Sequence, residues 1–441
     1  MTGSFVQVLI FLLAGIAVIV LLTAKYRVHP FFALLIACFL VGLGVQMPFA
    51  EILTAVKTGF GHIMQSLGLI IVLGTTLGVL LEHSGCTKVM ANFILKKTGE
   101  KKAPLAMSIT GFIVGLPVFC DSGYIVLSGL NQSLAKRTGI SVVIMATSLA
   151  TGLYAVHCLL PPHPGAAAAA VTIGVDFGKL IVIGIAVAIP GMLAGYFWAG
   201  YAGKKILYVA AEKEHIDQAT TQSVLMAFLP VIVPVLLIAV NSFFALEKNS
   251  GNVLQKIFAV LGEPVIALSV GVLLVFTTVR TWTKQTVSKL LQEGAEKAGG
   301  ILVIIGAGGA FGAVLAATKI GEHFGQSLNL ASMGIFFPFL LTFILKTAQG
   351  SSTVAIITAA SIIQPLLPAL GLDSENGKLL CVLSMGAGSM MISHANDAYF
   401  WVISKFSGLE MRPMLKVYSV ATIWMGLVTL LVVYILSLLL L

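Results

Sequence analysis

Short motifs of polar and helix-breaking residues that could bind a small ligand interrupt two long apolar stretches of the sequence. The residues are His157, Pro162, His163 and Gly165 in the first stretch, and Ser393, His394, Asn396 and Asp397 in the second. Because a bilayer helix satisfies its own backbone hydrogen bonds, unwound backbone is tolerated there only beside protein or a water-filled cavity. Paired interruptions in the two halves of a chain are typical of secondary transporters. The spacing therefore predicts a transporter whose ligand site includes two broken helices.

The side chains of these two motifs leave several roles open. The histidines could donate to a substrate or carry protons, or they could be packing residues beside the site. The hydroxyl and amide groups of Ser393 and Asn396 suit a polyhydroxylated ligand. Asp397 could bind a proton or a cation, or it could cap the half-helix that follows it.

A third polar segment, Gly115–Gly123, places Asp121 among apolar residues. A charged side chain at the bilayer centre costs about 2.5–3.5 kcal/mol on insertion scales. A coupling role would explain this cost, because a protonated carboxyl is cheaper to move through a low-dielectric barrier than a carboxylate. The alternative is a structural acid bonded to the turn. Ser122 and Gly123 follow directly and are predicted to contact substrate.

The fourth polar segment begins at Lys346 and continues through Gly350, Ser351, Ser352 and Thr353. A glycine followed by three hydroxyl residues predicts a helix start with free backbone N–H groups and a positive dipole end. Such a start can hold a carboxylate, and Lys346 would supply the matching charge. An ordinary helix cap beside a snorkelling lysine is the alternative.

Composition assigns the chain to a membrane. It is 58% hydrophobic with a mean hydropathy of +1.03, and only 10% of its residues are charged, compared with about 25% in soluble domains. The net charge of +9 does not predict a nucleic-acid partner, because the basic residues follow the loops of a membrane topology. The five cysteines lie in or beside apolar stretches, which favours packing over disulfides.

The predicted fold class is an all-α polytopic membrane protein, an inverted repeat with two re-entrant hairpins and two broken transmembrane helices. Continuous crossings are expected near residues 5–24, 29–46, 63–82, 180–201, 225–245, 264–279, 298–318 and 417–441. The hairpins are expected near 104–136 and 332–371, and the broken helices near 142–175 and 378–405.

The distribution of basic residues predicts the orientation of the chain. With both termini outside, most of the 26 Lys and Arg fall in inner loops, as the positive-inside rule requires. The order of elements then recurs from the opposite face. This predicts an N-terminal half of residues 1–202, a cytoplasmic linker of residues 203–223 and a C-terminal half of residues 224–441.

The motifs together resemble those of the gluconate permease family. The residues that carry the resemblance are Val156–Gly165, Gly350–Ala355 and Ser393–Trp401, and the resemblance extends from about Val28 to the C-terminus. It implies proton symport of gluconate or a related small sugar acid or hydroxy-carboxylate across the bacterial inner membrane. It also implies an elevator-type mechanism and a homodimer. No cofactor, metal ion or enzymatic activity is expected.

Other functions compete with this interpretation. A sodium-coupled carboxylate transporter, an antiporter and a permease for D-serine or hydroxy acids would use similar residues. An intramembrane metal hydrolase is disfavoured because no tight ligand spacing such as His-Glu-x-x-His is present. A channel is disfavoured because paired half-helix sites without an uninterrupted polar stripe favour alternating access.

Overall fold

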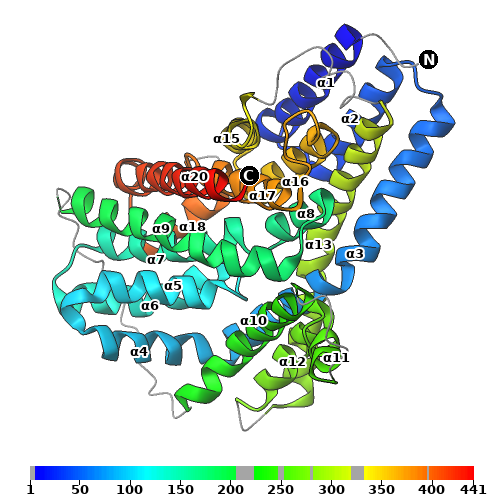
Figure 1. Cartoon of the computed structure of the whole chain (residues 1–441). Helices are drawn as coiled ribbons and strands as arrows, with labels where there is room; N and C mark the ends of the chain where they lie inside the picture. Colours follow the sequence, from blue (N-terminus) through cyan, green and yellow to red (C-terminus); the bar gives the residue numbers. More distant parts are fainter. Residues whose placement is uncertain (1–4, 205–222, 247–252, 279–281, 319–331, 395–396) are drawn as a thin grey trace.

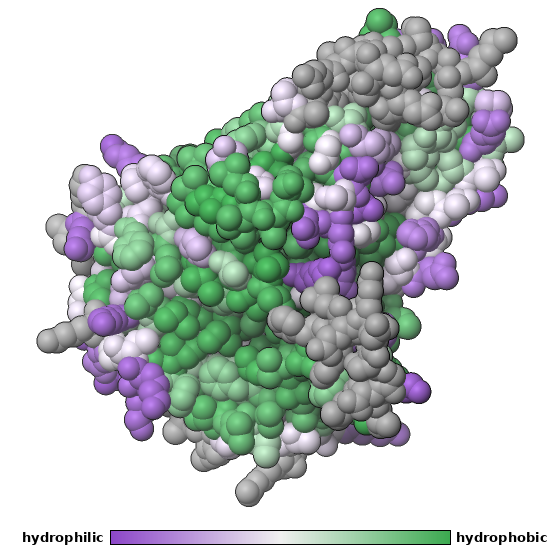
Figure 2. All heavy atoms as spheres, viewed as in Figure 1, coloured by the Kyte–Doolittle hydropathy of each residue, from purple (hydrophilic) through white to green (hydrophobic). Residues whose placement is uncertain are grey.

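The computed structural model describes the chain apart from residues 1–4, 205–222, 247–252, 279–281, 319–331 and 395–396 (Figure 1). The described residues form helices and connecting turns, with no strand among them. Seven of the described helices are long and apolar enough to cross a membrane. Figure 2 shows broad hydrophobic areas over one face of the molecule. The prediction of an all-α polytopic membrane protein is confirmed.

The first half of the chain contains nine α-helices in the described residues. They are α1 (Phe5–Val20, continued by a π-helical stretch Leu21–Lys25), α2 (Pro30–Gly44), α3 (Phe49–Ser84), α4 (Cys86–Thr98), α5 (Ala103–Gly115), α6 (Cys120–Thr138), α7 (Val142–Leu159), α8 (Pro164–Ile173) and α9 (Phe177–Gly203).

The described helices of the second half follow a similar order. They are α10 (Val224–Leu246), α11 (Val253–Leu261), α12 (Pro264–Phe276), α13 (Lys284–Ala317), α15 (Phe336–Gln349), α16 (Ser352–Ile363), α17 (Glu375–Met390), α18 (Ala398–Ser407), α19 (Met411–Pro413) and α20 (Val420–Leu440). A π-helical stretch, Met414–Ser419, joins α19 to α20.

All four predicted interruptions fall between separate helices. The two hairpin tips separate α5 from α6 and α15 from α16, and the two breaks separate α7 from α8 and α17 from α18. The matching order of elements in the two halves is consistent with a repeat. Three features stay predictions: the inverted orientation of the repeat, the re-entrant character of the hairpins, and the linker of residues 203–223. Most of that linker lies outside the described residues.

The helix that contains the third predicted crossing of each half is longer than the sequence analysis predicted. α3 begins at Phe49 rather than near residue 63, and α13 begins at Lys284 rather than near residue 298. The added turns contain charged residues, such as Glu51 and Lys57 in α3, so an uncharged apolar run marks only part of each helix. Gly59 and Gly309 allow close packing, because a Cβ added at Gly59 would lie 2.3 Å from the Gly309 carbonyl oxygen.

Two groups of helices surround the four interruptions. The long helices α3 and α13 lie side by side and pack with α2 (Figure 1). In the other group α5 packs on α7, α7 on α9, and α9 on α20, while α17 joins the second hairpin to α20. The half-helices α8 and α16 pack against each other between these groups, and they contact α3 and α13 respectively. The fold therefore gathers the interrupted segments at its centre.

Candidate functional site

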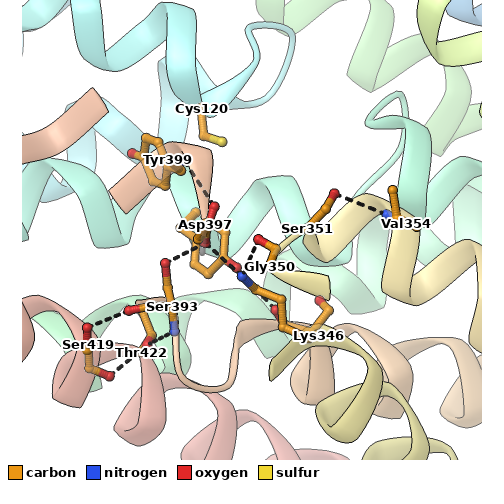
Figure 3. Close-up of polar contacts among 12 residues, drawn as sticks. Cys120, Lys346, Gly350, Ser351, Val354, Ser393, Asp397, Tyr399, Ser419 and Thr422 are labelled. Carbon is orange, nitrogen blue, oxygen red and sulfur yellow. Dashed lines mark hydrogen bonds and ion pairs between the residues drawn. The ribbon is translucent and has the colours of Figure 1, made fainter. Parts of the chain in front are cut away.

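The start of α16 is shaped by a glycine turn. Gly350 ends α15 with a φ of 81°, a left-handed conformation that a side chain disfavours. Ser351 then caps α16, because its hydroxyl accepts a hydrogen bond from the backbone N–H of Val354 at 3.3 Å (Figure 3). The remaining N–H groups of the first turn have no partner within the helix, so they are available to an anion.

Asp397 lies at the centre of a buried polar cluster (Figure 3). Its Oδ1 caps α18 by accepting from the backbone N–H of Tyr399 at 3.0 Å. Its Oδ2 accepts from the ammonium group of Lys346 at 2.7 Å and from the hydroxyl of Ser393 at 2.5 Å. Lys346 also donates to the carbonyl of Gly350 at 2.9 Å. The cluster therefore ties the second hairpin tip to the second break.

Ser393 is in turn held by the last long helix and the stretch before it. Its backbone N–H donates to Thr422 Oγ1 at 3.0 Å, and its carbonyl accepts from Ser419 Oγ at 2.5 Å (Figure 3). The neighbouring His394 is half-buried, and its carbonyl accepts from the N–H of Asp397 at 2.8 Å. These bonds fix the backbone of the second break.

The two histidines of the first break have different surroundings. His163 Nε2 lies 2.6 Å from the carbonyl oxygen of Gly115, which links the break to the first hairpin. The ring of His157 stacks on Tyr154, with 6.2 Å between centroids and 14° between planes. Its Nδ1 has no hydrogen-bond partner among the described residues. Nδ1 of His163 also has no partner among the described residues, but of the two histidines His157 is the one that lines the cavity.

A cavity of about 480 Å³ lies where the hairpin tips and breaks meet. Its polar wall consists of Asp121, Ser122, Tyr154, His157, Lys297, Gln349, Gly350, Ser351, Ser352, Thr353, Asp397 and Tyr399. The rest is lined by Phe119, Cys120, Pro164, Ile301, Ile304, Val354 and Ala398. It is large enough for a small organic acid.

The predicted site residues fall into two sets. Those that line the cavity are Asp121, Ser122, His157, Gly350, Ser351, Ser352, Thr353 and Asp397. Those placed beside it are Gly123, Pro162, His163, Gly165, Lys346, Ser393 and His394, while Asn396 lies outside the described residues.

The residues beside the cavity have structural contacts instead. Pro162 lies in a small apolar pocket that faces α3, and Gly165 packs on Thr353 and Ile356 of α16. Gly123 packs against Leu153 of α7. Periodicity along one helix cannot reveal these contacts, because each one joins segments far apart in the chain.

Four polar residues that were not selected from the sequence also line the cavity: Tyr154, which stacks on His157, and three more. Gln349 precedes the glycine turn, and neither polar atom of its amide has a partner among the described residues. Its position beside Gly350 was the available signal. Tyr399 donates to the carbonyl of Ala150 at 3.2 Å, which leaves its ring against the cavity. Lys297 is the last of the four, and it lies on α13, outside the four polar segments that the sequence analysis selected.

The two acids of the cavity differ in their partners. Asp397 is neutralised by Lys346. Asp121 forms no ion pair with any described residue, and its Oδ1 receives only the weak thiol donor of Cys120 at 3.8 Å. Of these two acids, Asp121 is thus the one whose charge the protein leaves uncompensated.

Known proteins are similar to this chain in sequence and in fold. The model of the GntP family permeases matches residues 7–439. The gluconate permease of Pseudomonas aeruginosa is 32% identical over 439 residues, which cover 96% of each chain. The D-serine transporter DsdX of Escherichia coli O6:H1 is 30% identical over 421 residues, covering 93% of this chain and 94% of the relative.

A solved structure shares the overall fold. The YdaH transporter of Alcanivorax borkumensis superposes with a TM-score of 0.65 at 14% identity, covering 87% of this chain and 88% of its own. The family match spans almost the whole chain and agrees with the resemblance of the polar motifs. The chain belongs to the GntP family of permeases, whose named relatives are transporters and not enzymes.

Proposed function

We propose that the protein is a proton-coupled symporter of gluconate or a related small sugar acid or hydroxy-carboxylate. The observation that carries the proposal is the composition of the cavity wall. Residues of the first turn of α16 line one cavity of about 480 Å³ together with Gln349 and His157, whose side chains hold polar atoms without a partner among the described residues. Backbone N–H groups suit a carboxylate, and amide and hydroxyl groups suit a polyol chain.

Proton coupling is proposed for Asp121. Its carboxyl borders the substrate cavity without a cationic partner among the described residues. If substrate and proton enter together, the neutral carboxyl lowers the cost of carrying the loaded site through a low-dielectric barrier. Sodium coupling is the alternative, because a carboxylate beside hydroxyl groups also suits a hard cation.

Transport would follow an elevator-type cycle in which the group holding α5–α9 and α15–α20 moves against α3 and α13. The apolar pocket between α3 and the first break, lined by Ile70, Leu77, Pro117 and Pro162, supports a smooth contact between them. The proposal includes an inverted repeat of residues 1–202 and 224–441, a homodimer, and both termini outside the bacterial inner membrane. A similar protein is named inner membrane permease YgbN in Escherichia coli.

D-Serine or another hydroxy amino acid is the second candidate substrate. The uncompensated carboxyl of Asp121 could pair with an ammonium group, and DsdX is named a D-serine transporter. Gluconate has no cation to offer Asp121, so the two substrates require different protonation of this residue.

Uptake into proteoliposomes tests the proposal. We expect an inward proton gradient to drive accumulation of labelled gluconate, while a sodium gradient alone does not. Unlabelled sugar acids should compete more strongly than D-serine or dicarboxylates. Accumulation driven only by a sodium gradient would identify sodium as the coupling ion instead of the proton. Stronger competition by D-serine would identify D-serine as the preferred substrate.

A further inference from the structure

The charge of the buried lysine in the second hairpin is already paired inside the protein. Lys346 is fully buried, and its ammonium group lies 2.7 Å from Asp397 Oδ2 and 2.9 Å from the Gly350 carbonyl oxygen. It does not line the cavity. A second anion brought to this pair would have to displace a buried carboxylate, which is costly. The countercharge for an anionic substrate must therefore come from elsewhere.

Lys297 is the lysine that borders the cavity among the described residues. It lies on α13, and Ile301 and Ile304 line the cavity one and two turns further along the same helix face. α13 packs against α16, so this stripe faces the helix start that offers free N–H groups. A carboxylate between them would meet an ammonium group on one side and N–H donors on the other.

Lys297 is free to change partners. Its side chain is 39% exposed, and its ammonium group lies 2.7 Å from Glu293 Oε1, one turn earlier on α13. Exposed ion pairs of this spacing are weak. Glu82 of α3 is the other charged group that acts on this pair, and it is only partly buried. A substrate carboxylate can thus replace Glu293 without leaving a charge buried in the protein.

We propose that Lys297 is a substrate-binding residue that exchanges Glu293 for the carboxylate when the cavity is occupied. The inference rests on the proposed transport of a carboxylate. It adds that the charge contact comes from α13, whereas the N–H and amide donors come from the second hairpin. The substrate would then bridge the two helix groups in this conformation, and movement of one group would break the contact with Lys297.

Kinetics of gluconate uptake by neutral variants test the inference. Lys297→Gln should raise the apparent KM about tenfold or more, because a charge-assisted hydrogen bond is lost. Lys297→Arg should restore most of the affinity. Glu293→Gln should lower KM about twofold, since it removes the competing partner of the lysine. Lys289→Gln is the matched control, because this exposed lysine of α13 does not line the cavity.

The opposite direction of the two KM changes separates binding from structure. If the Lys297–Glu293 pair only stabilised α13, both neutral variants would change uptake in the same way, and the inference would be overturned. An unchanged KM in Lys297→Gln would also overturn it, leaving the proposed function intact. Absence of gluconate uptake by the unmodified protein would instead overturn the proposed substrate and the inference together.

Discussion

The ammonium group of Lys346 and the carboxylate of Asp397 lie 2.7 Å apart in the interior, 51 residues apart in the sequence. The pair connects the end of α15 to the start of α18, and the Gly350 carbonyl and the Ser393 hydroxyl complete it. Because both charges are satisfied inside the protein, the pair acts as a structural joint between the second hairpin and the second break. This arrangement changes what substitutions at both residues are expected to do.

Breaking this pair should destabilise the protein. Lys346→Ala or Asp397→Ala leaves one buried charge without a partner, which costs about 3–5 kcal/mol of unfolding free energy. Thermal unfolding of the purified protein in detergent should show the loss in either single variant. The double variant Lys346→Met with Asp397→Leu should recover most of it, because no unpaired charge remains. A stable Lys346→Ala protein with weak substrate binding would instead support direct contact between Lys346 and the substrate.

The neighbouring serines at the start of α16 should respond differently. Ser351 lines the cavity, but its hydroxyl oxygen already accepts the capping hydrogen bond, so Ser351→Ala should reduce stability by about 1 kcal/mol. Ser352 also lines the cavity, so Ser352→Ala should weaken apparent affinity roughly tenfold. Ser361→Ala is the control, since this residue of α16 bonds the Gly308 carbonyl away from the cavity. Equal KM values for Ser352→Ala and the unmodified protein would place the carboxylate elsewhere.

Asp121 should be required for coupling and not for exchange. Asp121→Asn mimics the protonated carboxyl, so we expect loss of proton-driven accumulation while counterflow exchange of substrate continues. Both are measured in proteoliposomes with and without an imposed pH gradient. Glu375→Gln provides a surface control, because its pair with Lys179 is exposed and contributes little. Uphill accumulation by Asp121→Asn would exclude this residue as the coupling acid.

The two histidines of the first break should separate into a binding and a structural role. His157→Phe keeps the ring stacking on Tyr154 but removes the free Nδ1, so KM should rise several-fold with stability retained. His163→Phe leaves the Gly115 carbonyl without its partner, which should cost about 1–3 kcal/mol of stability. Measurement of KM and thermal unfolding for both variants checks this. The reverse pattern would assign ligand contact to His163.

Labelling of an engineered cysteine tests the orientation. The five native cysteines are buried, so an impermeant maleimide should give a low background. His215→Cys in the proposed cytoplasmic linker should react only after the membrane is permeabilised. A cysteine inserted after Met1 should react in intact cells. Labelling of position 215 from outside would reverse the topology and the assignment of inner loops.

The sequence alone was sufficient to predict the helical membrane fold and the positions of the four interruptions. Charge scarcity and long apolar runs leave helices as the simplest spanning structure, because backbone groups in lipid must be paired within the segment. Proline and glycine mark the breaks, since proline lacks a donor and Gly350 adopts a positive φ. The same local chemistry indicated Asp121, His157 and the start of α16, all of which border the cavity.

The partners of these residues depended on tertiary structure. No local pattern shows that Lys346 is neutralised by Asp397, that His163 bonds Gly115, or that Lys297 on a distant helix borders the cavity. Sequence spacing determines which side chains share a helix face, but packing between helices determines which charges meet and cancel. The sequence therefore identified the polar segments, and only the fold determined which of their charges remain available to a ligand.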